Sequence, residues 1–282
     1  MPEIPEVEIT ARRLGAALSG AEVDSALAPG MVTMKTVKPP LGALEGRAVE
    51  GVRRIGKMPV VEFDGELSLL VHLMSAGRLQ AFEERASLRD KRSRLLIRLA
   101  DGRELRLREF GTKQRAWAKL LPAADVERDE MVATLGPEAW PAPPLEELAA
   151  AVDQARHLHP MLRDQRVIAG IGRSWVDEIL WEARLSPFRK GAELDAEEVE
   201  HLHAGLDVLG RALEHYEEVI GATVPDKLPM PLRVHRRQGE PCPRCGTTLE
   251  AVHFAEHVMT YCPEEQTGGR VYKDRRLSRL LK

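Results

Sequence analysis

The chain has 282 residues, of which 43% are hydrophobic and 30% are charged. This is the composition of a soluble globular protein with room for one large domain or two ordinary ones. The sequence shows no run near the roughly 18 apolar residues of a membrane span and no signal-peptide pattern, so we expect a cytoplasmic protein that does not contact a membrane. Its three cysteines make no even set of disulfides.

The formal net charge of −3 is unlike that of a protein whose whole surface binds nucleic acid. The charge is nevertheless segregated along the chain. Residues 231–282 contain ten Lys or Arg and six Asp or Glu, whereas residues 186–230 contain four and ten. A basic face can therefore coexist with an acidic one, and nucleic acid is not excluded as a partner.

The first residues, Met1-Pro2-Glu3-Ile4-Pro5-Glu6, carry the clearest chemical signal. Removal of Met1 leaves a proline whose nitrogen is a free secondary amine, which can attack a carbonyl-like carbon and form an iminium directly. An ordinary α-amine has a pKa of roughly 7.7–8.0, so a useful fraction is neutral and nucleophilic at neutral pH. Glu3 is long enough to move protons at the same centre. The alternative is an ordinary start and helix cap, with Pro5 opening the helix.

The predicted elements then follow in chain order. Apolar spacing predicts a helix over residues 6–18. Apolar or alternating runs at 60–63, 67–73, 95–99, 104–107 and 116–121 predict strands of an antiparallel β domain. Asp64-Gly65 and Asp101-Gly102 fall between such runs and predict hairpin turns.

A proline-rich linker is expected at 136–144. Beyond it, the pattern predicts helices at roughly 145–156, 158–165, 174–184 and 195–220, the last broken near Gly205. The tail from Leu232 is expected to form a β-hairpin module around the cysteines. The fold class is therefore α+β, with domains at 1–135, 145–222 and 232–282.

These segments resemble the formamidopyrimidine-DNA glycosylase/endonuclease VIII family, whose mature chains begin Pro-Glu-x-Pro-Glu. The run from His159 to Arg173, continuing through Asp177-Glu178-Ile179-Leu180 to Leu185-Ser186-Pro187, resembles the family's helix–two-turn–helix. The resemblance implies an N-terminal β-sandwich with an N-terminal helix, this helical domain, and a C-terminal zinc-finger-like β-hairpin. It also implies a DNA repair glycosylase with AP lyase (β-elimination) activity. The catalytic residues would be Pro2, Glu3, Glu6 and Lys57, the lysine lying in Arg53-Arg54-Ile55-Gly56-Lys57.

The resemblance also implies contacts with DNA. The turn at Gly170 and Gly172 can bend tightly and point amides at a phosphate. The family often has lysine where His159 stands and asparagine where Arg173 stands. Its finger presents an arginine at the position of His257, a charge that Arg270 or Arg244 could supply here.

Other family side chains fill the space left by a flipped nucleotide. Here they correspond to Met74 and Phe110. Met74 lies in the run His72-Leu73-Met74-Ser75-Ala76-Gly77-Arg78, one place earlier than the methionine of the family run. The usual arginine before Phe110 is replaced by Glu109, and Arg108 could take over its role.

The family's Cys₄ zinc finger is matched by Cys242, Cys245 and Cys262, with Glu265 in the fourth place. A carboxylate can bind zinc, although structural sites favour Cys and His. His253 or His257 could replace Glu265 as the fourth ligand, or the finger could fold without metal. We expect a structural zinc, bound less firmly than by four cysteines.

We therefore expect a monomeric, nucleoid-associated enzyme that acts on damaged or abasic DNA. The stretch 221–232 is short and proline-rich, so there is little chain to cover a flipped base, and the enzyme is not expected to be dedicated to 8-oxoguanine. The rival hypothesis is a protein of the same fold that binds damaged or branched DNA with little turnover. A metal-dependent enzyme at the cysteines is not favoured, since no open site with a partnered base is apparent.

Overall fold

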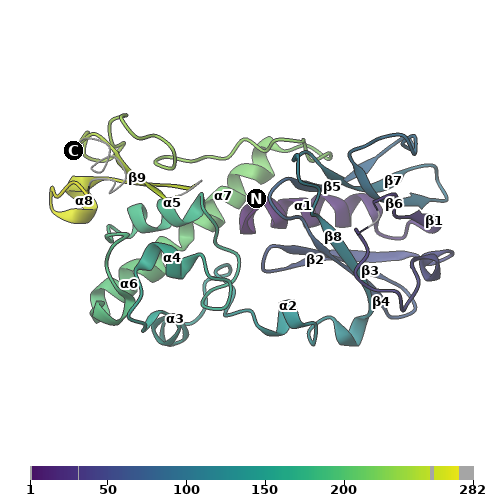
Figure 1. Ribbon diagram of the computed structural model, residues 1–282, viewed down its shortest axis with the longest axis horizontal. Coiled ribbons are helices and arrows are strands. Elements are labelled where there is room, and N and C mark those ends of the chain that lie inside the picture. Colours follow the sequence, from purple (N-terminus) through teal and green to yellow (C-terminus); the bar gives the residue numbers. More distant parts are fainter. Residues whose placement is uncertain (1, 31, 255–256, 273–282) are drawn as a thin grey trace. The chain divides into compact units, whose positions relative to one another are not determined.

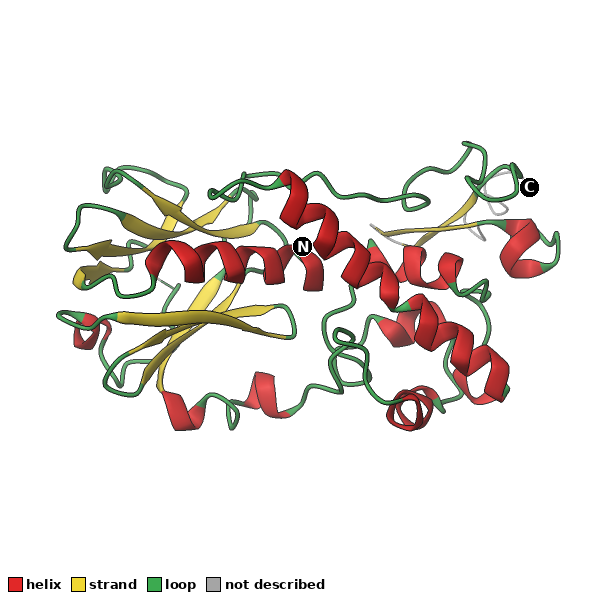
Figure 2. Cartoon of the chain, turned by 180° about the vertical axis from the view of Figure 1, so that it is seen from behind, coloured by secondary structure: helices red, strands yellow, loops and turns green. Residues whose placement is uncertain are grey.

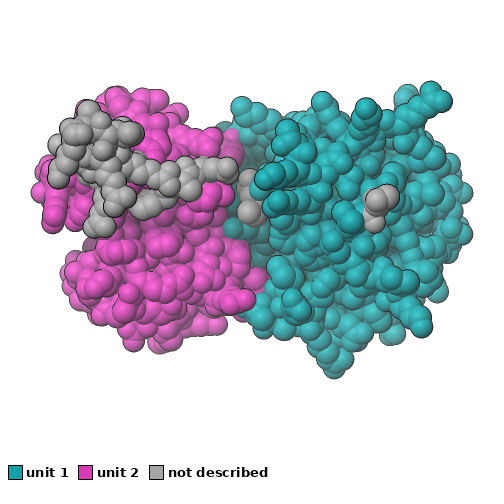
Figure 3. All heavy atoms as spheres, in the orientation of Figure 1, with its two compact units in different colours: residues 1–134, 213–229 teal, residues 135–212, 230–282 magenta. Residues whose placement is uncertain are grey.

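The computed structural model describes residues 2–30, 32–254 and 257–272. The chain forms two compact units, coloured separately in Figure 3. Unit 1 contains residues 1–134 and 213–229, and unit 2 contains residues 135–212 and 230–282. The three domains expected from the sequence divide the chain differently, and that subdivision stays a prediction.

Unit 1 is built on two four-stranded sheets in which all neighbouring strands run antiparallel. One sheet has the order β1-β6-β7-β5 and the other β2-β3-β4-β8. The strands are β1 (Val23–Leu27), β2 (Val49–Ile55), β3 (Met58–Phe63), β4 (Leu67–His72), β5 (Gly77–Phe82), β6 (Ser93–Leu99), β7 (Glu104–Glu109) and β8 (Trp117–Pro122). Buried side chains from both sheets form one hydrophobic cluster, so the sheets pack as a sandwich around a shared core.

Helix α1 (Ile4–Leu18) belongs to this core and contacts β2 and β3 of one sheet and β5 of the other (Figure 2). It buries Val7, Leu14 and Leu18, which recur at helical spacing on one face. Unit 1 also contains the short helix α2 (Glu130–Ala133) and two 3₁₀ turns, Leu41–Leu44 and Ala123–Asp125.

Unit 2 is mainly helical and contains one small β-hairpin among the residues that the structure describes (Figure 1). Its helices are α3 (Leu145–Val152), α4 (Leu158–Leu162), α5 (Trp175–Glu182), α6 (Ala196–Gly205), the first residues of α7 (Asp207–Val219), and α8 (Pro263–Thr267), with a 3₁₀ turn at Gly191–Glu193. Strands β9 (Glu250–Phe254) and β10 (His257–Tyr261) form an antiparallel pair just before α8.

The predicted fold class is confirmed, including both hairpin turns. Asp64-Gly65 connects β3 to β4, and Asp101-Gly102 connects β6 to β7. The expected break in the long helix falls between α6 and α7. Gly205 is the last residue of α6 and packs closely on α5, where a Cβ would lie 2.9 Å from the Ile179 carbonyl oxygen.

The sequence pattern missed three strands, β1, β2 and β5. Strand β2 reads V-E-G-V-R-R-I, and its arginines are paired with distant carboxylates, Arg53 with Glu62 and Arg54 with Glu8. Such pairing cannot be read from local alternation of apolar residues. Within the residues that the structure describes, no helix is long and apolar enough to span a membrane.

Candidate functional site

The first turn of α1 is ordered by two carboxylates. Glu3 is the N-cap residue and Glu6 occupies the third helical position, and the two form a reciprocal capping box. The Glu3 backbone N–H donates to Glu6 Oε2 at 2.9 Å. Pro2, Glu3 and Glu6 are all buried, and the helix N-terminus favours negative charge at this end. The structure therefore gathers three of the four predicted catalytic residues at one helix end.

Lys57, the fourth, lies in the β2–β3 turn, after Gly56 with a φ of 55°. Burial lowers the pKa of His72 at the end of β4, and the positive charge of Lys57 lowers this pKa further. His72 is therefore neutral at neutral pH, and its ring stacks on Trp117 at 5.2 Å. Its Nδ1 accepts the backbone N–H of Met74 at 3.1 Å. Lys57 and Met74 thus both interact with His72, a residue that was not among the predicted site residues.

Met74 has a φ of 50°, in the left-handed region that side chains other than glycine rarely adopt. The resemblance places Met74 one residue ahead of the family methionine, and a methionine therefore occupies a backbone position suited to glycine here. The hydrogen bond to His72 helps to hold it there.

Phe110 is exposed at the end of β7, with 37% of its surface accessible. The guanidinium of Arg92 lies 5.1 Å from its ring and that of Arg108 lies 4.8 Å from it. An exposed ring flanked by two cations is suited to stacking on a nucleic-acid base. Arg108 also pairs with Asp226 at 2.8 Å. Arg92, which comes from the β5–β6 loop, is a member of this cluster that the sequence argument missed.

Glu109 does not face outward with Phe110. It is 2% exposed, and its carboxylate accepts the backbone N–H groups of Arg115 and Ala116 at 2.8 and 3.1 Å. The acidic side chain in the place of the family arginine therefore braces the loop that leads into β8. It adds no negative charge to the surface around Phe110.

The turn between α4 and α5 has the geometry expected of a helix–two-turn–helix. Gly170 has a φ of 98°, and Gly172 is buried. Gln165 braces the turn, accepting from the Gly170 N–H and donating to the Ile171 and Arg163 carbonyls, each at 2.9 Å. Arg173 follows the turn and is exposed, as a phosphate contact requires.

His159 does not fit a direct phosphate contact. It is 4% exposed, and its Nε2 lies 3.1 Å from Asp177 Oδ1. The same carboxylate contacts His235 Nδ1 at 2.6 Å and accepts the Thr260 N–H at 3.0 Å. His159 is therefore part of a buried polar network that joins α4 and α5 to the finger.

The neighbouring Glu178 joins the same parts of unit 2. Its carboxylate accepts the backbone N–H groups of Arg233, Val234 and His235, at 2.8 to 3.0 Å. Burial raises the pKa of Glu178, while the three amide donors act in the opposite direction. Asp177 and Glu178 together fix the start of the finger on α5.

The three cysteines meet in the finger. The sulfurs of Cys242, Cys245 and Cys262 all lie within 4.8 Å of one another. Burial and the two neighbouring sulfurs raise the pKa of Cys262 to about 12. Burial alone would raise the pKa of Cys242, but hydrogen bonds from the Cys245 and Arg244 backbone and from Trp181 lower it. Such crowded thiols fit a metal cation that holds them as thiolates, and zinc is the usual ion for this donor set.

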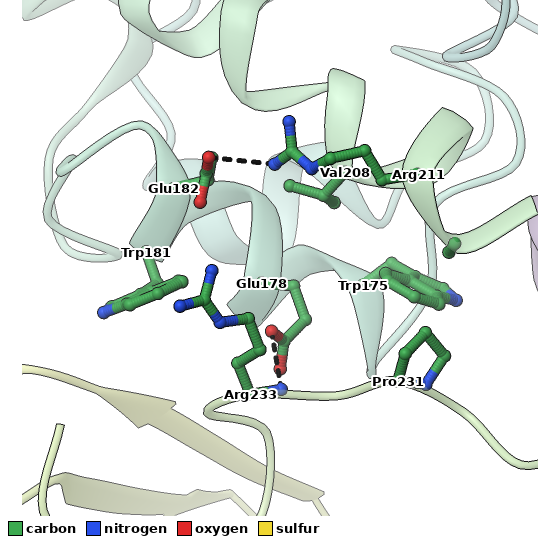
Figure 4. Close-up of a pocket in the computed structure, with 9 residues that line it drawn as sticks. Trp175, Glu178, Trp181, Glu182, Val208, Arg211, Pro231 and Arg233 are labelled. Carbon is green, nitrogen blue, oxygen red and sulfur yellow. Dashed lines mark hydrogen bonds and ion pairs between the residues drawn. The ribbon is translucent and has the colours of Figure 1, made fainter. Parts of the chain in front are cut away.

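Trp181 of α5 supports the cysteine site. Its indole N–H donates to Cys242 Sγ at 3.4 Å, and both residues are buried. The guanidinium groups of Arg233 and Arg244 lie over its ring at 4.5 and 4.1 Å. The indole therefore connects the helical domain to a metal ligand and to two arginines of the finger (Figure 4 shows Trp181 and Arg233).

Glu265 is not gathered with the cysteines among the residues that the structure describes. Its Oε2 lies 2.7 Å from Arg244 Nη1 and 3.4 Å from Arg184 Nε. Arg244 also pairs with Glu182 at 3.3 Å. The carboxylate in the fourth ligand position is thus part of an ion-pair cluster. Arg244 is occupied in the same cluster, which makes it a poor substitute for the DNA-binding charge expected at His257.

The remaining predicted contacts lie on the finger. His257 begins β10 and is half-buried, and Arg270 is exposed beyond α8, with its guanidinium 4.8 Å from the Tyr272 ring. Arg270 is therefore better placed than Arg244 to present a cation.

A small cavity of about 120 Å³ lies beside Trp181 in unit 2 (Figure 4). Its polar groups are engaged, Glu182 by Arg211 at 2.8 Å and Glu178 by three amides. Its lining does not form an open catalytic site. The lining residues are Trp175, Glu178, Trp181, Glu182, Val208, Arg211, Ala212, Pro231 and Arg233.

Three protein-family models match the chain. The formamidopyrimidine-DNA glycosylase N-terminal domain matches residues 1–113, and the H2TH domain of the same family matches residues 135–223. The zinc finger found in FPG and IleRS matches residues 239–264. This last match spans all three cysteines, and the prediction of a structural zinc is confirmed.

Known proteins are similar over nearly the whole chain. A formamidopyrimidine-DNA glycosylase of Roseiflexus sp. is 34% identical, over 94% of this chain and 100% of the relative. The crystal structure of the Thermus thermophilus protein is 29% identical, with a TM-score of 0.78, over 94% and 98% of the two chains. The Lactococcus lactis protein in complex with N7-benzyl-Fapy-dG DNA is 25% identical, with a TM-score of 0.83, over 94% and 100%.

Replacement of Glu265 tests whether its carboxylate binds the metal. We expect Glu265→Ala to retain about one zinc per chain, because the carboxylate pairs with arginines, while Cys262→Ala loses it. Elemental analysis after purification without added metal measures both. Equal loss of zinc in the two variants would identify Glu265 as a ligand.

Replacement of Trp181 tests its hydrogen bond to Cys242. Trp181→Phe keeps a ring for the two arginines but removes the N–H donor. We expect zinc affinity to fall by about 10- to 100-fold, the usual effect of losing a partner of a metal ligand. Competition with a chromogenic chelator measures the affinity. Trp175→Phe, at the other end of the same helix and equally buried, is the matched control. Equal affinities in both variants would contradict the role of Trp181.

Proposed function

Because the chain belongs to the formamidopyrimidine-DNA glycosylase family, we propose that it is a bifunctional DNA glycosylase and AP lyase whose nucleophile is the Pro2 amine. The observation that carries the assignment is the first turn of α1. Glu3 and Glu6 are buried there, and each occupies a defined place in the capping box directly after Pro2. Removal of Met1 would give Pro2 the secondary amine that the reaction needs.

The chemistry follows from these residues. The Pro2 nitrogen attacks C1′ of the damaged nucleotide and displaces the base, while Glu3 protonates the ring oxygen of the sugar. Opening of the sugar gives an iminium at C1′. This cation acidifies the C2′ hydrogen, a general base takes up that proton, and the C3′–O bond breaks, so that the strand on the 3′ side leaves with a 5′-phosphate. Hydrolysis of the iminium regenerates the amine.

The remaining residues bind the DNA around the reacting sugar. Lys57 would contact the adjacent phosphate, and Met74 and Phe110 would fill the space left by the flipped nucleotide, with Arg92 and Arg108 beside Phe110. The H2TH turn and exposed Arg173 would bind backbone phosphate, and Arg270 would add a cation from the finger. The DNA complex of the similar Lactococcus lactis protein supports this partner.

We place the enzyme at the chromosome in the cytoplasm, acting as a monomer.

The substrate class is limited by residues 221–229 of unit 1, which are held against strands β5 and β7. Gln80 donates to the Val224 carbonyl at 2.8 Å, and Arg78 and Arg108 bind the carbonyl and carboxylate of Asp226 at 2.9 and 2.8 Å. A short segment held at two points has little freedom to enclose a flipped purine. We therefore propose that abasic sites and ring-opened or oxidised bases are preferred to 8-oxoguanine.

A second candidate function is a protein that binds damaged DNA with little turnover. The pairing of Arg108 with Asp226 favours it, because this arginine must leave its partner before it can enter DNA. The ordered Glu3 and Glu6 favour the enzyme, because neither carboxylate is needed for binding alone.

Borohydride trapping tests the nucleophile. The protein is incubated with duplexes bearing an abasic site, and a covalent adduct reports the iminium. We expect Pro2→Gly to trap far less, and protein that retains Met1 to trap none, because the secondary amine is then lost. Glu3→Gln should slow base release by about 10²–10⁴-fold and act less on preformed abasic sites, where no base is displaced. Parental trapping and cleavage by Pro2→Gly would show that another group is the nucleophile.

A substrate panel tests the damage preference. Single-turnover rates are compared on abasic, formamidopyrimidine, oxidised-pyrimidine and 8-oxoguanine duplexes, the last paired with cytosine. We expect 8-oxoguanine to be the slowest, because residues 221–229 are short and held down. A panel in which 8-oxoguanine reacts fastest would defeat the preference.

A further inference from the structure

A tyrosine of α7 contacts the carboxylate beside the N-terminus of α1, and both lie in unit 1. The Tyr216 hydroxyl donates to Glu6 Oε1 at 2.7 Å. The other oxygen of the same carboxylate accepts the Glu3 N–H at 2.9 Å. Glu6 therefore links the backbone of Glu3 to a residue 210 positions away. Tyr216 has no exposed surface and Glu6 has 4%.

The segment that carries Tyr216 is fixed from α1 as well. Arg13 pairs with the Glu217 carboxylate at 2.6 Å and donates to the carbonyls of Glu217, Ile220 and Gly221 at 3.0 to 3.2 Å. These are among the last carbonyls of α7 and its cap, which lack partners within the helix. A cation at this end also complements the helix dipole. The position of Tyr216 against α1 is therefore set by several contacts.

Tyr216 acts as a donor over the whole working pH range. Burial raises its pKa well above the ordinary value, and the negative charge of Glu6 and the hydrogen bond to it raise the pKa further. The hydroxyl thus stays protonated and directs its proton at Glu6. A hydrogen bond to a charged acceptor is among the stronger ones in proteins.

We propose that Tyr216 is a positioning residue for the amine chemistry, acting through Glu6 on Glu3 and the adjacent Pro2. The proposal rests on the proposed function. By holding one oxygen of Glu6, Tyr216 directs the other toward the Glu3 N–H and so fixes the residue that follows the nucleophile. Correct positioning of reacting groups raises a reaction rate by orders of magnitude. One hydrogen-bond donor that fixes this position from a distance can therefore affect the chemical step.

The test uses Tyr216→Phe in the full chain, which keeps the ring and removes the hydroxyl. Tyr261→Phe is the matched control, because Tyr261 has no exposed surface and its hydroxyl accepts the Tyr272 N–H at 2.8 Å within the finger. Parent and variants are compared by single-turnover cleavage at an abasic site, by binding of the same duplex, and by thermal unfolding.

We expect Tyr216→Phe to slow the single-turnover step by about tenfold or more, the effect of one hydrogen bond to a charged group, with little change in DNA affinity. Tyr261→Phe should keep the parental rate. In a Glu6→Gln background, Tyr216→Phe should reduce the single-turnover rate much less than it does in the parent, because the two residues act as one unit. Parental rates in Tyr216→Phe, or the same cost with and without Glu6→Gln, would overturn the proposal.

Hydrogen exchange of the Glu3 amide gives a readout that does not need activity. Tyr216→Phe should speed this exchange, whereas Tyr261→Phe should not. A parent that forms no trapped adduct on any substrate would defeat the proposed function, and the exchange data would still decide the role of Tyr216. Unchanged exchange in Tyr216→Phe would refute its positioning role.

Discussion

The candidate active site depends on the buried carboxylate of Glu6. Burial of a carboxylate raises the free energy of the folded state by on the order of several kcal/mol unless hydrogen-bond donors replace the lost water. Two of its donors are the Glu3 N–H and the Tyr216 hydroxyl. One lies in the first turn of α1 and the other in α7, so satisfying this single charge brings the two segments of unit 1 together. Chain termini commonly fray, and this arrangement orders the residues directly after Pro2.

Unit 2 uses the same physical device in a purely structural setting. Asp177 and Glu178 are buried in the first turn of α5, where the helix dipole favours negative charge. Their donors come from the chain that enters the finger and from Thr260 of β10. The finger is thus fixed to α5 by carboxylates as well as by its metal. A cysteine site with a changed fourth position is tolerable because zinc is not the sole attachment.

The parts of the fold that were predictable are those set by neighbours in sequence. Asp64-Gly65 defines a hairpin turn by itself, and Glu3 with Glu6 has the spacing of a capping box. The positions of Glu109, His159 and Tyr216 were not predictable. Their partners lie 6 or 7, 18 and 210 residues away, and only the folded chain shows which way each side chain turns. The same limit explains why Arg92 was missed: it lies in the β5–β6 loop, and its partner Phe110 follows β7.

Three of the departures from the family pattern share a physical outcome. Glu109 replaces an arginine, Glu265 a cysteine, and His159 what is often a lysine, and each could have weakened binding to a polyanion. In the structure, Glu109 and His159 are buried and Glu265 is paired with arginines. Because charges satisfied internally add little field at the surface, these changes add little negative field around exposed cations such as Arg173 and Arg270. These three side chains therefore act as supports within the fold, and none of them belongs to the capping box that Glu3 and Glu6 form at the start of α1.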